Sequence, residues 1–301
     1  MFPVSYAAGC MEGTCQVMKR IGVTAKPDDE RAEALAVELC EWLQERGCEV
    51  FLDEHVGRVC GTVISLDEMP KQVELMIVLG GDGTLLTVGR RFIGHDVPIL
   101  GINLGRLGFL TDTPVGSMFD VVEEVLAGNS KSRMHFGLKA ETWRNGEKLG
   151  CGFAMNDVVL QRNDHPRMIE FEMSVREQFV FRLRADGLVL ATPAGSTAYA
   201  LSAGGPIVHP EVDAITVAPI CPHILSNRPI VVPGNDKIEL TLLDSPNMAA
   251  LNLDGQVHME LQSGDCICIE KAGYIKLVYL PERHYYDTLR TKLHWAGHEG
   301  N

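Results

Sequence analysis

An almost wholly apolar segment that runs directly into a glycine-rich turn constrains this chain most. The segment is Val73–Leu79, and the sequence Gly-Gly-Asp-Gly-Thr follows it from Gly80 to Thr84. Such a short apolar run without alternation is typical of a strand buried on both faces of a parallel sheet. Residues 85–92 then have helical character, so the turn joins a buried strand to a helix. This order predicts an α/β sheet with the turn at the carboxyl end of a strand, where such sheets bind ligands.

The glycine-rich turn is suited to binding phosphate. Glycine lets a ligand approach the backbone closely, and the free N–H groups at the start of a helix attract anions. Asp82 places a carboxylate there, which could orient a hydroxyl group, accept its proton or hold Mg2+. The alternative is a plain turn in which Asp82 only caps the helix. The chain has no GxxxxGK[ST] motif and lacks the protein kinase motifs, which excludes both of those classes.

Alternating strand and helix patterns occupy the first part of the chain. Further strands are predicted at Met18–Thr24, Glu49–Leu52 and Val97–Ile102. Helices are predicted from Asp28 or Asp29 to Arg46 and from Met118 to Ala127. We therefore expect an α/β domain with an open Rossmann-like sheet at residues 17–129.

After residue 129 the pattern changes to short strands separated by turns, with one helical interruption near Ser196–Ala203. Asn145-Gly146 is a strong hairpin signal. This pattern predicts an all-β, sandwich-like domain at residues 130–281. The tail at residues 282–301 regains helical character and is expected to return to the first domain. Strands are predicted at Leu138–Trp143, Val158–Gln161, Ile169–Val175, Phe179–Arg184, Leu188–Ala191, Ile230–Val232, Ile238–Leu243, Ala249–Asp254, Cys266–Glu270 and Ile275–Leu280.

The composition limits the partners and the compartment. Forty acidic and 27 basic residues give a formal charge of −13, which argues against nucleic acid as a partner. No apolar run approaches the ~18 residues that a membrane-spanning helix needs, so no membrane association is expected. The first 18 residues resemble no secretory signal. The nine cysteines show no CxxC or zinc spacing, so we expect buried, reduced thiols, no metal-ligating residues and a cytoplasmic location.

Three segments of the second domain carry candidate recognition groups. Ala191–Tyr199 is rich in small and hydroxyl residues, which suits a nucleotide-binding loop or a structural helix cap. A serine nucleophile is the least favoured alternative, because the segment has no GxSxG elbow. Asn156-Asp157 could bind an adenine edge or ribose hydroxyls, or could be a polar strand end. Arg184 and Asp186 lie on one face of a strand, where a surface ion pair is the more common outcome.

Five segments, in this order, resemble the NAD kinase family over about residues 18–295: Gly80–Thr84, Asn156-Asp157, Asp186-Gly187, Thr192–Tyr199 and Gly204–Pro206. The resemblance implies transfer of a phosphoryl group from ATP to the adenosine 2′-hydroxyl of NAD, which gives NADP and ADP. It implies that Asp82 activates this hydroxyl group and that Mg2+ or Mn2+ accompanies ATP. Nucleotide contacts are implied for Gly83, Asn156, Asp157, Arg167, Arg184, Asp186, Ala194, Thr197, Ala198, Tyr199, Ala200, Leu201, Ser202 and Gln256.

The resemblance also implies a homodimer or homotetramer in which the β domain of one subunit can complete a neighbour's site. Two residues depart from the family pattern. Ala194 stands where many members have Thr, so a hydroxyl contact is lost there, and Asp157 stands where Glu is common. Two alternatives are a lipid kinase that shares the glycine-rich turn and a non-catalytic NAD(H)-binding sensor. The sensor would have no need of the Asp82 carboxylate.

Overall fold

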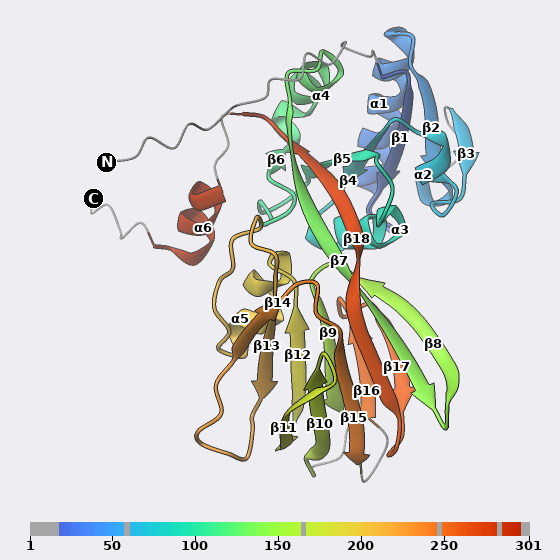
Figure 1. The fold of residues 1–301 in the computed structure, drawn as a ribbon. Coiled ribbons are helices and arrows are strands. Elements are labelled where there is room, and N and C mark those ends of the chain that lie inside the picture. The colour runs from blue at the N-terminus through green and yellow to red at the C-terminus, as the bar shows by residue number, and fades with distance from the viewer. Residues whose placement is uncertain (1–17, 57–60, 164–166, 246–248, 282–284, 296–301) are drawn as a thin grey trace, which may run out of the picture.

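The computed structural model describes residues 18–56, 61–163, 167–245, 249–281 and 285–295. An α/β region occupies the upper part of Figure 1 and an all-β region the lower part. Two long antiparallel strands, β7 (Lys131–Arg144) and β18 (Cys266–Tyr279), run from one region into the other. The expected order, an α/β sheet followed by an all-β region, is confirmed. None of the described helices is long and apolar enough to cross a membrane.

The parallel strands of the α/β region follow the order β5-β4-β1-β2-β3. The chain therefore builds one side of the sheet with β1 to β3 and then crosses to the other side for β4 and β5. Ligands bind at the carboxyl ends of strands where the order reverses in this way. The strands are β1 (Arg20–Ala25), β2 (Glu49–Asp53), β3 (Thr62–Ile64), β4 (Leu75–Leu79) and β5 (Pro98–Asn103), with a short β6 (Thr113–Pro114) beside β5.

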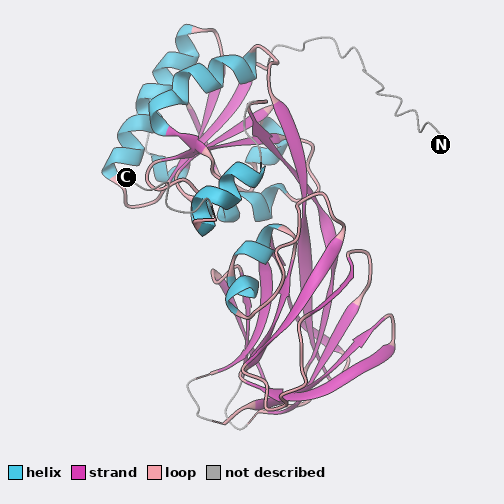
Figure 2. Ribbon diagram, turned by 90° about the vertical axis from the view of Figure 1, so that its left-hand side faces the viewer, coloured by secondary structure: helices cyan, strands magenta, loops and turns pink. Residues whose placement is uncertain are grey.

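Helices cover both faces of this sheet (Figure 2). The helices α1 (Glu30–Glu45) and α4 (Met118–Leu126) share one apolar cluster with the sheet, while α2 (Met69–Gln72) and α3 (Asp82–Phe92) share the other. Asp29 caps α1 by accepting the N–H of Ala32 at 3.2 Å. All five residues of β4 are buried, as its apolar sequence predicts.

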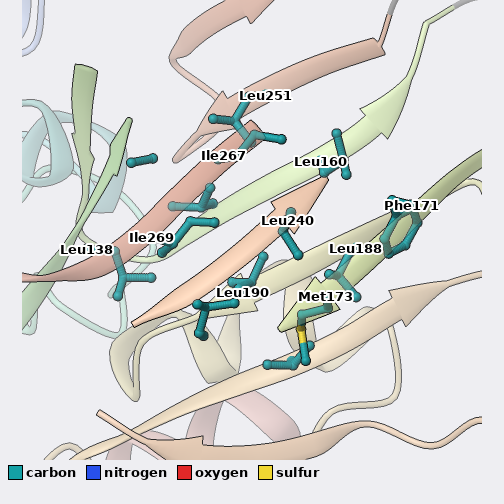
Figure 3. Packing of buried hydrophobic residues seen from close by; sticks show 14 of the residues in the cluster. Leu138, Leu160, Phe171, Met173, Leu188, Leu190, Leu240, Leu251, Ile267 and Ile269 are labelled. Atoms are coloured by element: carbon teal, nitrogen blue, oxygen red, sulfur yellow. The ribbon is translucent and has the colours of Figure 1, made fainter. Parts of the chain in front are cut away.

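The all-β region consists of two sheets packed face to face. One sheet has the order β14-β13-β12-β9-β16-β17, and the other continues the α/β sheet through β18, β15, β10 and β11. Leu160, Leu188 and Phe171 meet between them in the largest buried apolar cluster (Figure 3). The remaining strands are β8 (Glu147–Ala154), β9 (Asp157–Arg162), β10 (Ile169–Val175), β11 (Gln178–Ala185), β12 (Gly187–Ala191), β13 (Ala214–Ile220), β14 (Ile230–Pro233), β15 (Ile238–Asp244), β16 (Ala249–Leu253) and β17 (Val257–Leu261).

Two sequence predictions about strands need correction, and the strands β3, β6, β8, β13 and β17 were not predicted. Cys266–Glu270 and Ile275–Leu280 are parts of the single strand β18, because a register shift near Gly273 interrupts its alternation without ending the strand. The strand predicted at Leu138–Trp143 extends over all of β7. Strand β13 escaped prediction because Pro219 lies within it. The hairpin at Asn145-Gly146 is confirmed, with both residues at positive φ (51° and 83°).

The cysteines differ from the expectation of buried, reduced thiols. Cys151, Cys221 and Cys266 are free but exposed, and Cys40 is disulfide-bonded. Cys266 is exposed because it lies on the face of β18 opposite the buried Ile267. The predicted tail helix is present as α6 (Tyr285–Leu293), whose Leu289 is buried. The Lys292 ammonium of α6 lies 6.0 Å from the ring centre of Phe109 in the α/β region, and the rings of Tyr285 and Tyr286 lie 4.8 and 5.8 Å from that of His209 in the all-β region, so the tail contacts both regions.

Candidate active site

Asp82 is the first residue of α3 and follows the buried strand β4. Its carboxylate accepts the N–H groups of Phe109 (2.8 Å), Leu110 (3.1 Å) and Thr111 (2.9 Å), and the Thr111 hydroxyl at 2.9 Å. The helix N-cap is Gly81, and no side chain makes a capping hydrogen bond there. Asp82 therefore does not act as a cap. It ties the glycine-rich turn to the loop after β5.

The loop after β5 needs a glycine to bring its backbone to Asp82. A Cβ atom on Gly108 would lie 1.9 Å from Asp82 Oδ1, far inside van der Waals contact. Asn103 holds the same loop from inside, since its Nδ2 donates to Thr111 Oγ1 at 2.9 Å and its Oδ1 accepts from Gly105 N at 2.7 Å. The loop that carries Gly105 and Gly108 is thus part of the Asp82 environment.

Asn156 and Asp157 lie at the start of β9 in the all-β region. The Asn156 carbonyl accepts the N–H of Thr192 at 2.9 Å, so these residues adjoin the loop that begins at Thr192. Asn156 Oδ1 is buried and has no hydrogen-bond partner among the described residues, which leaves an acceptor for a ligand. Burial raises the pKa of Asp157 to about 7, and the nearby charge of Asp254 adds to the shift.

The segment from Thr192 to Ser202 forms a compact turn, with a short 3-10 helix at Ala194–Thr197 and helix α5 at Tyr199–Ser202. The buried Ser196 hydroxyl donates to the Pro193 carbonyl at 2.6 Å and accepts the Val208 N–H at 2.9 Å. Because Ser196 is fixed inside the turn, the serine nucleophile is excluded.

The nucleotide-binding candidates in this segment lie together on this short stretch of backbone. They are Ala194, Thr197, Ala198, Tyr199, Ala200, Leu201 and Ser202. A cavity lined by Ala194 and Thr197 extends to Phe109 and Leu110, whose N–H groups bind Asp82. A second cavity, of about 400 Å3, is lined by Asn156, Asp157, Ala198 and Tyr199.

Arg184 and Asp186 lie away from this cluster. Strand β12 pairs with β9 so that Ala191 is opposite Asp157 and Gly187 is opposite Gln161, four residues further along. At ~3.3 Å per residue this places Asp186 more than about 13 Å from Asp157. Asp186 pairs with Arg162 (Nε to Oδ1, 2.7 Å), not with Arg184 as the sequence spacing suggested. Arg167, just before β10, is exposed.

Gln256 faces α3. Its Nε2 donates to the Gly83 carbonyl at 3.0 Å, and its Oε1 accepts from Arg90 Nη2 at 2.6 Å. Sequence analysis missed Arg90 and Asp254, whose side chains form a buried ion pair of 3.0 Å. The Asp254-Gly255 pair at the end of the strand predicted at Ala249–Asp254 was a turn signal that could have drawn attention to this position.

Two family models cover most of the chain. The ATP-NAD kinase N-terminal domain matches residues 21–130, and the ATP-NAD kinase C-terminal domain matches residues 155–279. The chain belongs to the NAD kinase family. The enzyme expected from the sequence, which phosphorylates NAD with ATP, is the enzyme of this family, and the lipid kinase alternative is wrong.

Relatives and solved structures agree with this membership. The NAD kinase of Thiobacillus denitrificans is 45% identical over 281 residues, covering 92% of this chain and 97% of the relative. That of Syntrophotalea carbinolica is 43% identical over 285 residues, covering 93% and 99%. A yeast NADH kinase in complex with NADH has a TM-score of 0.84 at 27% identity, covering 95% of this chain and 89% of that one. An NAD kinase from Archaeoglobus fulgidus in complex with ATP has a TM-score of 0.69 at 26% identity, covering 91% and 98%.

Proposed function

We propose that Asp82 is the general base of NAD phosphorylation. The 2′-hydroxyl oxygen attacks the γ-phosphorus of ATP, the bond to the ADP oxygen breaks, and the hydroxyl proton passes to the Asp82 carboxylate. The observation that carries the proposal is the position of this carboxylate at the free N-terminus of α3, on the switch-point edge of the sheet. Its Oδ2 atom accepts one described hydrogen bond, from Phe109 N, and so retains capacity for a proton.

We propose that the divalent cation is brought by the phosphates of ATP. Among the described residues, no group of three His, Cys, Asp or Glu side chains is placed to hold a metal ion. Both Asp82 oxygens already accept protein hydrogen bonds, which does not suit a dedicated metal cage. Mg2+ commonly binds through substrate phosphates and few carboxylates, and Mn2+ would serve in the same way.

The acceptor nucleotide is proposed to bind between the loop at residues 109–111, which contacts Asp82, and the Thr192–Ser202 turn. The unpartnered Asn156 Oδ1 supports recognition of the adenine amino group, and Asp157 would bind a ribose hydroxyl. Gly83 lies beside Asp82, where it would contact the same nucleotide. Because Ala194 has no hydroxyl group, only its backbone can contribute. The small side chain of Ala198 and the backbone from Thr197 to Ser202, Ala200 and Leu201 included, complete the contact surface, while the Ala200 side chain is buried against the β sheet.

Arg167, Arg184 and Asp186 are proposed to act on the site of a neighbouring subunit in a homodimer or homotetramer. The distance of Asp186 from Asp157 along β12 supports this assignment for Asp186, and Arg167 is exposed. Exposed apolar side chains on the edge strand β11 and the loop before β14 also suit a subunit interface, since Phe179 is 64% exposed and Leu225 is 97% exposed.

We propose a cytoplasmic location. The exposed free thiols of Cys151, Cys221 and Cys266 suit a reducing compartment.

The base assignment is tested with purified protein, ATP, Mg2+ and NAD, with NADP formation as the readout. Asp82→Asn keeps the shape of the side chain and is expected to lower kcat by about 10²–10⁴-fold. Removing the divalent cation with a chelator should abolish turnover, and Mg2+ or Mn2+ should restore it. A kcat for Asp82→Asn near that of the wild type would overturn the base assignment. Absence of NADP formation by the wild type would favour the sensor alternative.

A further inference from the structure

A polar bridge joins the two halves of the proposed site across the domain boundary. It consists of Arg90 on α3, and Asp254 and Gln256 in the turn between β16 and β17. Asp254 and Gly255 both have positive φ, 52° and 63°, which makes the turn tight. As a result, two side chains from one short turn of the all-β region both reach the same helix of the α/β region.

Asp254 is the acceptor at the centre of the bridge. Its carboxylate receives the backbone N–H groups of Met155 (2.9 Å), Asn156 (2.7 Å) and Asp157 (3.2 Å), and it pairs with Arg90 Nη1 at 3.0 Å. The Asp254 side chain is fully buried and that of Arg90 is 10% exposed. One carboxylate therefore fixes the backbone that presents Asn156 and Asp157, and one guanidinium joins that carboxylate to α3.

Gln256 connects the same guanidinium to the glycine-rich turn. Its Oε1 accepts from Arg90 Nη2 at 2.6 Å, and the Thr87 hydroxyl lies 2.7 Å from the same oxygen. Its Nε2 donates to the carbonyl of Gly83, the residue that follows Asp82, at 3.0 Å. Hydrogen bonds thus run without a gap from Gly83 through Gln256, Arg90 and Asp254 to the Asn156-Asp157 pair.

Apolar packing alone does not fix this geometry. Met155 is 1% exposed and packs in the apolar cluster of α3, so the two regions would stay in contact without the bridge. Met155 is, however, a flexible side chain that accommodates small shifts. The two nitrogens of the Arg90 fork each have one acceptor, and such bidentate binding sets orientation as well as distance.

We propose that Arg90, Asp254 and Gln256 are positioning residues that fix Asn156 and Asp157 relative to Asp82, and so set the distance between the acceptor hydroxyl and the phosphoryl donor. The inference rests on the proposed roles of Asp82, Asn156 and Asp157. Gln256 thereby acts through the protein, in contrast to the substrate contact that the family resemblance implies for it.

The test compares kcat, KM for NAD and melting temperature of purified variants. A misplacement of about 1 Å can cost about 10²-fold in rate, so Arg90→Met should lower kcat by about 10²-fold with little change in KM. Arg90→Lys keeps the charge and one donor direction, and should recover at least about tenfold of that loss. Gln256→Leu removes the connection to Gly83 at an exposed position and should lower kcat by about tenfold.

Arg144→Met is the matched control. Like Arg90, Arg144 pairs with a fully buried aspartate, here Asp265 through two hydrogen bonds (2.7 and 2.9 Å), but at the β7–β8 hairpin, at the end of the all-β region away from α3 (Figure 1). It should lower the melting temperature and leave kcat unchanged. Equal losses of kcat in Arg90→Met and Arg144→Met, or wild-type kcat in Arg90→Met, would overturn the proposal. If Arg90→Met does not fold, Gln256→Leu alone tests the proposal, and a wild-type kcat in Gln256→Leu overturns it.

Asp82→Asn is assayed in parallel to separate the two proposals. If Asp82→Asn loses activity and Arg90→Met keeps it, the bridge fails and the base assignment stands. If Asp82→Asn keeps wild-type kcat, the base assignment fails, while the Arg90→Met and Arg144→Met comparison still reports on the bridge.

Discussion

The buried carboxyl group of Asp157 should make the stability of this protein depend on pH in a way that one substitution removes. Burial, and then the charge of Asp254, raise its pKa from 3.8 to about 7 in the folded protein. Between these values the unfolded chain has released the proton and the folded protein still holds it. Unfolding therefore becomes more favourable as the pH rises through this window, and the stabilisation is fully present only below pH 3.8.

Asp157→Asn removes this titration while keeping the size of the side chain. From the two pKa values, the contribution of Asp157 to the free energy of unfolding should fall by about 2 to 3 kcal/mol between pH 5 and pH 8. The stability of Asp157→Asn relative to the wild type should rise by that amount over the same range. Urea denaturation at several pH values, with tryptophan fluorescence as the signal, measures the difference.

His135 makes the comparison with a variant necessary. Burial, and then the charge of Arg133, lower the pKa of His135 from 6.5 to about 4, so its contribution to stability falls as the pH drops through that window. Asp157 and His135 therefore act in opposite directions, and only the difference between wild type and variant isolates Asp157. Glu147→Gln, on the exposed β8, serves as the control. A difference for Asp157→Asn that stays within about 0.5 kcal/mol from pH 5 to pH 8 would refute the reasoning.

Two further predictions concern the loop beside Asp82 and the subunit interface. Gly108→Ala should displace the Asp82 carboxylate and lower kcat by at least about tenfold, because its Cβ would lie 1.9 Å from Asp82 Oδ1. Gly116→Ala, which meets nothing within 4 Å, should leave kcat unchanged, and equal effects of the two variants would contradict the prediction. Leu225→Asp places a charge on a side chain that is 97% exposed, so it should shift the protein toward monomers in light scattering if this surface is an interface. An unchanged oligomer in that variant would remove Leu225 from the proposed interface.

The fold could be predicted largely because its signals are local. The buried strand before Gly80, the capping Asp29 and the hairpin at Asn145-Gly146 each depend on a few adjacent residues, and each appears where the sequence placed it. The long strand β18 was divided in two because the register shift near Gly273 disturbs the alternation on which strand prediction depends. Its pairing with β5 across the domain boundary has no local signal at all.

The site was predictable to the extent that its groups lie in recognisable motifs. The contacts of Asp82 with the loop at residues 109–111 join segments 27 to 29 residues apart, and Arg90 meets Asp254 across 164 residues. Neither Arg90 nor Asp254 belongs to a glycine-rich or hydroxyl-rich motif. Their importance comes from pairing in three dimensions, which composition and periodicity do not encode. The same limit explains why Asp186 was paired with Arg184, its neighbour in sequence, when its partner is Arg162 on the adjacent strand.

Three carboxylates of the candidate site differ in the groups that surround them. Asp82 is held by three backbone N–H groups and a hydroxyl group, and Asp254 by three N–H groups and the Arg90 guanidinium. Asp157 accepts the N–H of Tyr199, but burial and then the charge of Asp254 raise its pKa to about 7. A protein with a charge of −13 thus keeps carboxylates near the start of α3 by satisfying them with backbone donors. A cation at the candidate site, Arg90, is then available to orient Asp254 and Gln256.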